Sequence, residues 1–427
     1  MKGNLSGKVV FQAPRGTRDV LPDEISLWER VEGEARALFR VHGFREIRPP
    51  LFEETLLFAR SIGEATDVVE KEMFTVEREG SSYTFRPEGT AGVVRAYLEA
   101  GLHKTRPFQK LFYIGPMFRY ERPQKGRERQ FHQIGIETLG SLDPFLDAEA
   151  IHIAASFFER LGIRDLEVRI NSMGDSEDRD RYRELLRKFL APKIAQYCAQ
   201  CRARFERNVF RVLDCKVPED AQRSAGAPSI LESLGPVAAG HFERVRAALG
   251  ALGRAVAVYP RTVRGFDYYT RTVFEIHDPQ LGARSALCGG GRYDRLIQTL
   301  GGPDLGAVGF AIGVTGTLIA LESRKLAQDA GTQKIQVFVA VKEESDRLQA
   351  LRLAAALWRE GISTEYVHED GKSLKSQLRA ADGLGTGVVL IASPTLIGVK
   401  SMSTGSQFDV PASDLGRVVD EVKKLLA

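Results

Sequence analysis

The stretch PFQKLFYIGPMFRYERPQKGRERQFHQIGIETLG, residues 107–140, contains two β-type runs separated by a polar, basic segment. The runs are LFYIGPMFRYE (111–121) and QFHQIGIETLG (130–140), and both are rich in aromatic and β-branched residues. The connection between them is short, as in an antiparallel pair. We therefore predict two antiparallel strands joined by a basic loop, at the heart of a mixed and mainly antiparallel sheet.

The flanking sequence predicts helices and strands that complete an α+β domain over residues 1–325. Residues 25–43 carry apolar residues at helical spacing and end at Gly43, a typical helix stop. A second helix follows FRPEGT and ends at Gly101, and a third spans 147–161 before the strand LEVRINS. Further strands follow in VAVYPRTVRGFDYYTRTVFEIHD and GAVGFAIG.

Two segments depart from this pattern. Residues 175–252 are charged and helical, are interrupted by the Gly/Pro/Ser-rich piece SAGAPS, and predict an inserted helical subdomain. After the charged linker ESRKLAQDAGTQK, residues 333–427 alternate strand-like and helical runs, with helices expected near 344–360, 372–383 and 413–426. That alternation predicts a C-terminal α/β domain with a largely parallel sheet.

Bulk composition excludes several classes of protein. Hydrophobic residues make up 43% and charged residues 27% of the 427 residues, which are globular values. No apolar run is long enough for a membrane span or a signal peptide, and four cysteines are too few for a secreted disulfide scaffold. We expect a cytoplasmic protein. The net charge of +4 says little about partners, but residues 110–129 contain six Lys or Arg against two Glu, a candidate phosphate-facing patch.

Four islands place charged groups beside turns and strands: FRPEGT (85–90), MFRYERPQKGRERQFHQIGIE (117–137), VRGFDYYT (263–270) and CGGGRYD (288–294). Active-site groups are often held in such positions. Buried charges must be paired or must bind a ligand, so arginines and glutamates on one small sheet point to a binding site.

As a set, these islands resemble the histidyl-tRNA synthetases, a family of class II aminoacyl-tRNA synthetases. The resemblance extends from PRGTRD (14–19) to the α/β tail, and RGFDYYT resembles the element that distinguishes the histidine-specific enzymes. It implies a class II synthetase-like catalytic domain, an anticodon-binding domain over 333–427, and a homodimer. The implied function is ATP- and Mg²⁺-dependent activation of L-histidine to histidyl-adenylate, with transfer to the 3′ end of tRNA(His).

The resemblance also implies a role for each site residue. Arg119 and Arg264 would be catalytic and hold the α-phosphate of ATP, Arg264 in place of a metal. Glu88, Gly89 and Thr90 would receive the α-ammonium group of histidine, with Gln133 near its carboxylate and amine. Glu137 and Tyr269 would bracket the imidazole, and Tyr268 and the GGGR turn would shape the pocket floor. Arg127, Arg129 and Thr315 would lie toward the ATP phosphates or, for the two arginines, the tRNA acceptor end.

The sequence departs from the family where the GFAIG strand meets its helix. The family has a Glu-Arg pair there, and its arginine reaches the γ-phosphate, but this chain has Thr315 and Gly316, followed by Thr317. A helix N-terminus and a hydroxyl can still bind phosphate, but they supply no full charge. Three interpretations stay open: a ligase, impaired or compensated at this point; a non-catalytic histidine sensor, such as a regulatory subunit of ATP phosphoribosyltransferase; or an isolated change confined to 315–317.

Three cysteines lie in the predicted insertion, Cys198 and Cys201 in CAQC and then Cys215. A structural zinc ion normally takes four Cys or His ligands, and the sequence shows no evident fourth, since Cys288 belongs to the CGGGRYD island. We predict free, partly buried thiols and no metal, with a zinc site as the alternative.

Overall fold

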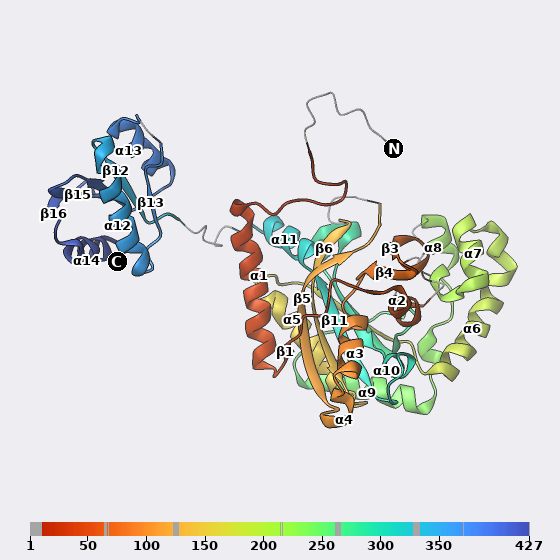
Figure 1. The fold of residues 1–427 in the computed structure, drawn as a ribbon. Coiled ribbons are helices and arrows are strands. Elements are labelled where there is room, and N and C mark those ends of the chain that lie inside the picture. Colours follow the sequence, from red (N-terminus) through yellow and green to blue (C-terminus); the bar gives the residue numbers. More distant parts are fainter. Residues whose placement is uncertain are drawn as a thin grey trace. The chain divides into compact units, whose positions relative to one another are not determined.

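A computed structural model describes residues 11–63, 66, 68–122, 128–213, 215, 217–260, 266–327, 334–369 and 371–426. The chain divides into two compact units, residues 1–330 and 331–427. Each unit is described by itself (Figure 1). In the described ranges, no helix is both long and apolar enough to cross a membrane.

An eight-stranded sheet forms the frame of the first unit, in the order β1-β5-β6-β11-β10-β9-β7-β8. Its strands are β1 (Arg45–Glu46), β5 (Gln109–Phe118), β6 (Gln130–Leu139), β7 (Glu167–Ser172), β8 (Ala257–Val258), β9 (Thr270–His277), β10 (Ala286–Arg292) and β11 (Ala307–Gly313). The central neighbours from β5 to β7 are antiparallel, and only the outer pairs β1–β5 and β7–β8 are parallel. The predicted mixed, mainly antiparallel sheet is confirmed.

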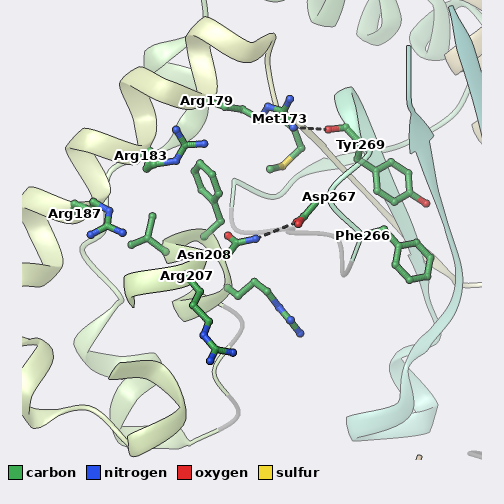
Figure 2. A pocket seen from close by; sticks show the side chains of 12 residues that line it. Met173, Arg179, Arg183, Arg187, Arg207, Asn208, Phe266, Asp267 and Tyr269 are labelled. Carbon is green, nitrogen blue, oxygen red and sulfur yellow. Dashed lines mark hydrogen bonds between the residues drawn. The ribbon is translucent and has the colours of Figure 1, made fainter. Parts of the chain in front are cut away.

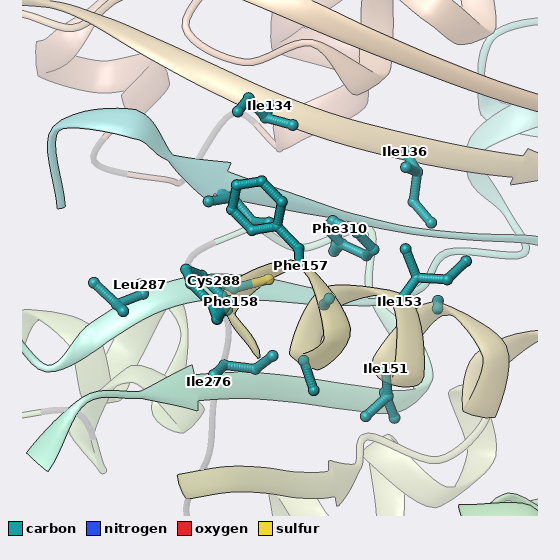
Figure 3. Close-up of a cluster of buried hydrophobic side chains, with 14 of the residues drawn as sticks. Ile134, Ile136, Ile151, Ile153, Phe157, Phe158, Ile276, Leu287, Cys288 and Phe310 are labelled. Carbon is teal, nitrogen blue, oxygen red and sulfur yellow. The ribbon is translucent and has the colours of Figure 1, made fainter. Parts of the chain in front are cut away.

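One face of this sheet is covered by helices and carries the main hydrophobic core. The covering helices are α1 (Pro22–Val41), α5 (Phe145–Arg160), α9 (Pro236–Ala251) and α11 (Val314–Ser323). Figure 3 shows Phe157 and Phe158 of α5 among side chains of the strands, including Ile134 and Phe310. Because side chains alternate along a strand, the same strands present a second set of residues on the opposite face.

Shorter elements lie beside the opposite face. They include α2 (Thr55–Ile62), α3 (Thr90–Glu99), α4 (Leu102–Thr105), α10 (Leu296–Thr299), the short helix η1 (Val68–Glu72), and an antiparallel sheet of β2 (Phe52–Glu54), β4 (Ser81–Phe85) and β3 (Phe74–Arg78). The kinked helix η5 (Pro279–Arg284) instead packs Leu281 against the main core. The segment Arg86–Gly89 joins β4 to α3 and brings FRPEGT to the sheet. In the run FREIRPPLFEE, the Pro49–Pro50 pair predicts an edge or a break in a strand. The structure has a break there, because the run forms β1 and β2 in different sheets.

The segment predicted as a helical insertion, 175–252, contains two differently packed parts. The elements α6 (Ser176–Leu190), η2 (Ala191–Gln196), α7 (Ala199–Arg207), η3 (Val209–Val212) and η4 (Ile230–Ser233) contribute to a separate small core containing Tyr182, Leu186 and Cys201. Helix α8 (Pro218–Arg223) is linked to them through Asp220, which accepts the backbone N–H of Cys198. Helix α9 instead packs into the main core through Phe242 and Val245. The Gly235–Pro236 junction is where the chain returns to the sheet.

The second unit is an α/β domain with its own core. Its elements are β12 (Val337–Val341), η6 (Glu344–Asp346), α12 (Arg347–Arg359), β13 (Thr364–Tyr366), α13 (Leu374–Gly383), β14 (Val388–Ala392), β15 (Leu396–Ser401), β16 (Gln407–Pro411) and α14 (Leu415–Leu426). Strands β13, β12 and β14 are parallel, as predicted, but β15 and β16 add an antiparallel hairpin. The predicted alternation of helices with parallel strands is confirmed for β13, β12 and β14. The prediction of a largely parallel sheet was wrong, because the unpredicted hairpin makes the other two pairings antiparallel.

Candidate active site

The face of the large sheet opposite the main core carries several residues with little or no side chain. Across neighbouring strands, Gln133, Gly135 and Glu137 of β6 lie opposite Gly115, Tyr113 and Leu111 of β5 and opposite Gly313, Ala311 and Gly309 of β11. Gly289 and Gly291 of β10 continue the row beside Ala311 and Gly309. The small residues let larger side chains, including Tyr113 and Glu137, lie close against the backbone of this face. We call this surface the glycine floor.

Two of these glycines are required by close contacts. A Cβ at Gly309 would lie 2.1 Å from Oε2 of Glu137 and 2.3 Å from the carbonyl oxygen of Ile136. A Cβ at Gly135 would lie 2.4 Å from the hydroxyl oxygen of Tyr113. Backbone on β11 thus makes room for the Glu137 carboxyl, and backbone on β6 makes room for the Tyr113 ring.

Glu88, Thr90 and Glu137 form one buried hydrogen-bonded group. The Glu88 carboxylate accepts the backbone N–H of Thr90 at 2.5 Å and that of Ala91 at 2.9 Å, so it caps the start of α3. The Thr90 hydroxyl donates to Oε1 of Glu137 at 2.7 Å, and the Tyr293 hydroxyl donates to Oε2. The predicted histidine-binding residues of FRPEGT and β6 therefore meet in space.

Burial changes the protonation of both carboxyl groups. Loss of water raises the pKa of Glu137 to about 8, although the hydrogen bonds from Tyr293 and Thr90 oppose the shift. Burial also raises the pKa of Glu88, against the backbone donors of Ala91 and Thr90 and the charge of Arg119. Two carboxyl groups with raised pKa values in one site are a common sign of a binding or catalytic centre.

Aromatic rings form the wall of this site. Tyr268 lies next to Tyr269, with ring centroids 4.7 Å apart, and 5.5 Å from the ring of Tyr293. Burial raises the pKa values of Tyr268, Tyr293 and Tyr113 well above that of a free phenol, so these hydroxyls stay protonated and able to donate. The wall is apolar in its rings and polar at its tips.

Arg119 follows β5 directly and is held toward the FRPEGT turn. Its Nε donates to the carbonyl oxygen of Pro87 at 2.8 Å, and its guanidinium carbon lies 5.3 and 5.4 Å from the ring centroids of Phe131 and Phe266. The two rings fix the plane of the guanidinium next to Glu88, which suits a group that must hold a phosphate in one orientation. Oε1 of Gln133 is buried with no hydrogen-bond partner in the described part of the chain, so it fits a donor supplied by a ligand.

Both acidic and basic side chains lie at the end of this sheet face beside the start of α11. Arg129 stacks on Tyr120 with its guanidinium carbon 3.7 Å from the ring centroid, and its Nη1 donates to the carbonyl oxygen of Arg15 at 3.3 Å. The Thr315 hydroxyl, at the start of α11, donates to Oε2 of Glu128 at 3.3 Å. Oε1 of Glu128 accepts from Nε of Arg18 at 3.2 Å. An acid bridged to an arginine therefore lies where the family resemblance implies an arginine on the helix.

Some predicted residues lie beyond what the structure describes, and some contributing residues were not predicted. Arg127 and Arg264 fall in 123–127 and 261–265, outside the described residues. Tyr113 and Tyr293 were missed, because a tyrosine in a strand reads as a core residue. Arg86 was also missed: it is buried beside Gly115, where its Nε donates to the carbonyl oxygen of Pro116 at 2.9 Å.

The glycine pattern was the available signal for these contacts. Glycines at alternate positions of neighbouring strands indicate large groups crossing the sheet face. Such a pattern marks where groups cross but does not show which residues supply them.

The matched regions decide the family. The family model of histidyl-tRNA synthetase matches residues 16–316, which include every island described above. The chain belongs to the histidyl-tRNA synthetase family.

Relatives of this family align with nearly the whole chain. The histidine–tRNA ligase of Anoxybacillus flavithermus is 45% identical over 94% of this chain and 96% of its own length, and that of Lysinibacillus sphaericus is 43% identical over 95% and 98%. The apo histidyl-tRNA synthetase of S. aureus has a TM-score of 0.79 at 32% identity, covering 98% of this chain and 100% of that chain. At 20% identity, a protein from Bacillus halodurans named as an ATP phosphoribosyltransferase regulatory subunit/histidyl-tRNA synthetase shares the fold, with a TM-score of 0.64 over 90% of this chain and 99% of its own.

Proposed function

We propose that this chain activates L-histidine with ATP and transfers the histidyl group to the 3′ end of tRNA(His). The observation that carries the proposal is the buried Glu137 carboxyl, held by Thr90 and Tyr293 above the glycine floor. A buried polar group beside aromatic rings rejects ligands that leave it unpaired. An imidazole ring is flat, fits between tyrosine rings and offers a ring nitrogen to Glu137. Membership of the family supports the same function.

The α-ammonium and carboxylate groups of the histidine substrate would lie along this sheet face toward Arg119. The Glu88 carboxylate lies beside Thr90 and suits an α-ammonium group, since it already accepts two backbone N–H groups in a fixed orientation. The unpartnered Oε1 of Gln133, four residues before Glu137 on the same face of β6, would accept from the same ammonium group. The carboxylate is then directed toward the guanidinium of Arg119.

The first reaction needs no nucleophile from the protein. An oxygen of the histidine carboxylate attacks the α-phosphorus of ATP, the bond from that phosphorus to the bridging oxygen breaks, and pyrophosphate leaves. Arg119, fixed between Phe131 and Phe266, would stabilise the charge that develops on the α-phosphate. In the second reaction the terminal ribose hydroxyl of tRNA attacks the activated carbonyl, AMP leaves, and the phosphate itself can take the proton.

We propose that Mg²⁺ arrives with ATP as part of the substrate. Glu128 lies at the start of α11, and Glu121 lies with Oε1 4.0 Å from Nη1 of Arg119. Magnesium is commonly bound by one or two carboxylates together with substrate phosphates. Without a cation, these carboxylates would repel the phosphates of ATP, so the residues present fit a magnesium–ATP complex.

The helix start at Thr315 and Gly316 would give a weaker contact to the terminal phosphate than an arginine. Losing one charge-assisted contact costs about 2–4 kcal/mol of transition-state stabilisation. Arg18 is the described cation linked to this position, through Glu128. We propose that it partly replaces the missing charge.

The remaining functions follow from the family and from composition. We propose that residues 333–427 bind the anticodon region of tRNA, that the catalytic unit is 1–325, and that two copies form a homodimer in the cytoplasm. The absence of an arginine at 316 favours one alternative, a histidine sensor without ligase activity.

Histidine-dependent exchange of labelled pyrophosphate into ATP separates the two functions. The ligase predicts exchange that requires histidine, followed by charging of tRNA(His). A chain that binds histidine but shows no exchange at saturating ATP would be a sensor, and the ligase proposal would be wrong.

A further inference from the structure

Three cysteines and one aspartate of the helical insertion converge on a single point. Cys198 precedes α7, Cys201 lies in its first turn, Cys215 follows η3, and Asp220 lies in α8. One ligand atom from each of the four lies within 4.8 Å of every other. Cys201 and Asp220 are fully buried, and Cys198 and Cys215 are half-buried.

The spacing of the thiols fits a bound ion and not a disulfide. Sγ of Cys198 lies 3.9 Å from Sγ of Cys215, whereas bonded sulfurs are about 2.05 Å apart. Two thiolates at about 2.3 Å from a tetrahedral Zn²⁺ are separated by about 3.8 Å. We propose that Cys198, Cys201, Cys215 and Asp220 form a structural site for one divalent metal ion of the zinc type.

Asp220 supplies the fourth ligand that the sequence did not reveal. Its Oδ2 faces the thiols, 3.4 Å from Sγ of Cys215, and accepts the backbone N–H of Cys198 at 2.9 Å. Its Oδ1 accepts from Nη1 of Arg223 at 2.9 Å. One carboxylate oxygen is thus fixed by an arginine and the other is directed to the cluster, as in metal sites whose ligands are oriented by outer partners.

The local backbone also favours thiolate ligands. Cys198 is the N-cap of α7, and its sulfur accepts the backbone N–H of Cys201 at 3.4 Å. The N–H groups of a helix N-terminus are free to donate to a ligand atom placed there. Three thiolates with one carboxylate form a soft and compact ligand set, which selects Zn²⁺ over Mg²⁺ or Ca²⁺. A cluster of several iron atoms would require sulfurs farther apart than these.

The ion would fix one wall of an arginine-rich cavity beside the aromatic wall of the active site. This cavity of about 300 Å³ is lined by α6 and η3 and by Phe266, Asp267 and Tyr269 (Figure 2). Nδ2 of Asn208 donates to Oδ1 of Asp267 at 3.0 Å, and Asn208 lies between α7 and η3. Since the cluster joins α7, η3 and α8, it holds Asn208 against the segment that carries Tyr268 and Tyr269.

Metal analysis of the full-length reduced protein tests the site. We expect about one zinc ion per chain after expression in zinc-supplemented medium. After chelation under anaerobic conditions, titration with Co²⁺ should give the visible bands of a tetrahedral site and a thiolate-to-cobalt charge-transfer band.

Two variants of the cluster and one control variant make this result specific. Cys201→Ser should lower the charge-transfer intensity by about a third or abolish binding, because one of three thiolates is lost. Asp220→Cys should raise the intensity by about a third, because a fourth thiolate is added. An increase in charge-transfer intensity requires the side chain at position 220 to bind the metal. If Asp220 only supports the local structure, Asp220→Cys would not produce this increase. Cys288→Ala, in β10 of the main core, should leave the spectrum and metal content unchanged.

Three results would overturn the proposal. The first is a wild-type protein that binds neither zinc nor cobalt while its thiols are reduced. The second is a Cys198–Cys215 disulfide in protein prepared without oxidant and with no metal uptake. The third is an Asp220→Cys variant that binds Co²⁺ with an unchanged charge-transfer band, which would exclude Asp220 as a ligand.

Discussion

Glu137 is enclosed by hydroxyl groups and lies near a second buried carboxyl group, Glu88. Its pKa of about 8 results chiefly from loss of water. At neutral pH the Glu137 carboxyl therefore holds a proton that free glutamate would release. Bound histidine changes this balance, because a ring N–H stabilises the ionised carboxylate in place of water.

The first prediction concerns the dependence of folding stability on pH, measured without added histidine. The pKa of Glu137 is raised from 4.5 to about 8, so between these values the folded state holds a proton that the unfolded state has lost. The stabilisation that protonated Glu137 adds to the free energy of unfolding is therefore fully present below about pH 4.5. It falls as pH rises and is lost above about pH 8. Glu137→Gln removes this dependence, and urea unfolding at about pH 5 and pH 8.5 measures it.

The informative quantity is the difference in the free energy of unfolding between Glu137→Gln and wild type, because Glu88 and other groups titrate in both proteins. As pH rises from about 5 to about 8.5, the free energy of unfolding of Glu137→Gln should increase relative to that of wild type by on the order of a few kcal/mol. Glu54→Gln, at an exposed position of β2, serves as the control. An equal pH dependence in Glu137→Gln and wild type would contradict the raised pKa.

A second prediction concerns histidine recognition. Glu137→Gln should raise KM for histidine about ten- to hundredfold in pyrophosphate exchange, because a hydrogen bond to a charged group contributes about 1.5–3 kcal/mol. KM for ATP should stay near its wild-type value. If both constants change together, Glu137 supports the whole site and does not contact histidine.

A third prediction concerns position 316. A Cβ there would meet Cδ2 of Leu287 at 3.3 Å, the far end of a flexible side chain. Gly316→Arg should raise kcat/KM for ATP about thirtyfold or more, as expected for a restored charge-assisted contact of at least about 2 kcal/mol. Gly316→Gln, which adds length without charge, should give little of this gain. An unchanged ATP dependence in Gly316→Arg would show that the charge is not missing, and loss of activity in Arg18→Gln would then assign the role to Arg18.

At the scale of elements, the glycine floor depends on the register in which β6 and β11 pair. Gly309 lies opposite Glu137, and Ile136 of β6 presents its side chain to the other face. A shift of one residue would exchange the faces, because side chains alternate along a strand. The same alternation that builds the core therefore also builds the site.

A fourth prediction tests the floor directly. Gly309→Ala would place a methyl group 2.1 Å from Oε2 of Glu137 and 2.3 Å from a backbone oxygen. It should destabilise the protein by about 1–3 kcal/mol and abolish histidine binding, measured by urea unfolding and calorimetry. Gly240→Ala in α9 adds a methyl into open space and should be neutral or slightly stabilising. Wild-type binding by Gly309→Ala would contradict the proposed position of the imidazole.

Elements whose pattern is local were predictable from the sequence, and contacts between distant elements were not. The strands 111–121 and 130–140 were predicted, and the structure pairs Phe118 with Gln130. The β15–β16 hairpin was missed because its sequence carries weak turn and strand signals. The Glu137–Tyr293 contact depends on β6, β11 and β10 being adjacent, which no local pattern encodes. Asp220 was not recognised as a candidate fourth ligand for the same reason, because no local pattern shows that it meets the three cysteines.

At the scale of the whole molecule, the two units have separate cores. The C-terminal core includes Val339, Leu357, Leu390 and Val418, all fully buried within that unit. A unit with a closed core and its own five-stranded sheet has what it needs to fold alone.

The fifth prediction separates the activities of the two units. Residues 334–427 should fold cooperatively by themselves, as measured by thermal unfolding. Residues 1–327 should keep histidine-dependent pyrophosphate exchange and lose most charging of tRNA(His). The full-length chain, prepared in parallel, is the control for both. Charging at the wild-type rate by residues 1–327 would exclude a role for the second unit in binding tRNA.

The glycine floor also limits how the specificity of this protein can evolve. Where Gly135 and Gly309 lie, the Tyr113 ring and the Glu137 carboxyl rest against main-chain atoms, which every amino acid shares. Substitution at these positions can remove space but cannot create it. New substrates can be accommodated only through the tyrosines of the wall, by exchanging a ring for a smaller side chain. Random mutation of the floor thus leads to inactivity and not to the charging of tRNA with a wrong amino acid.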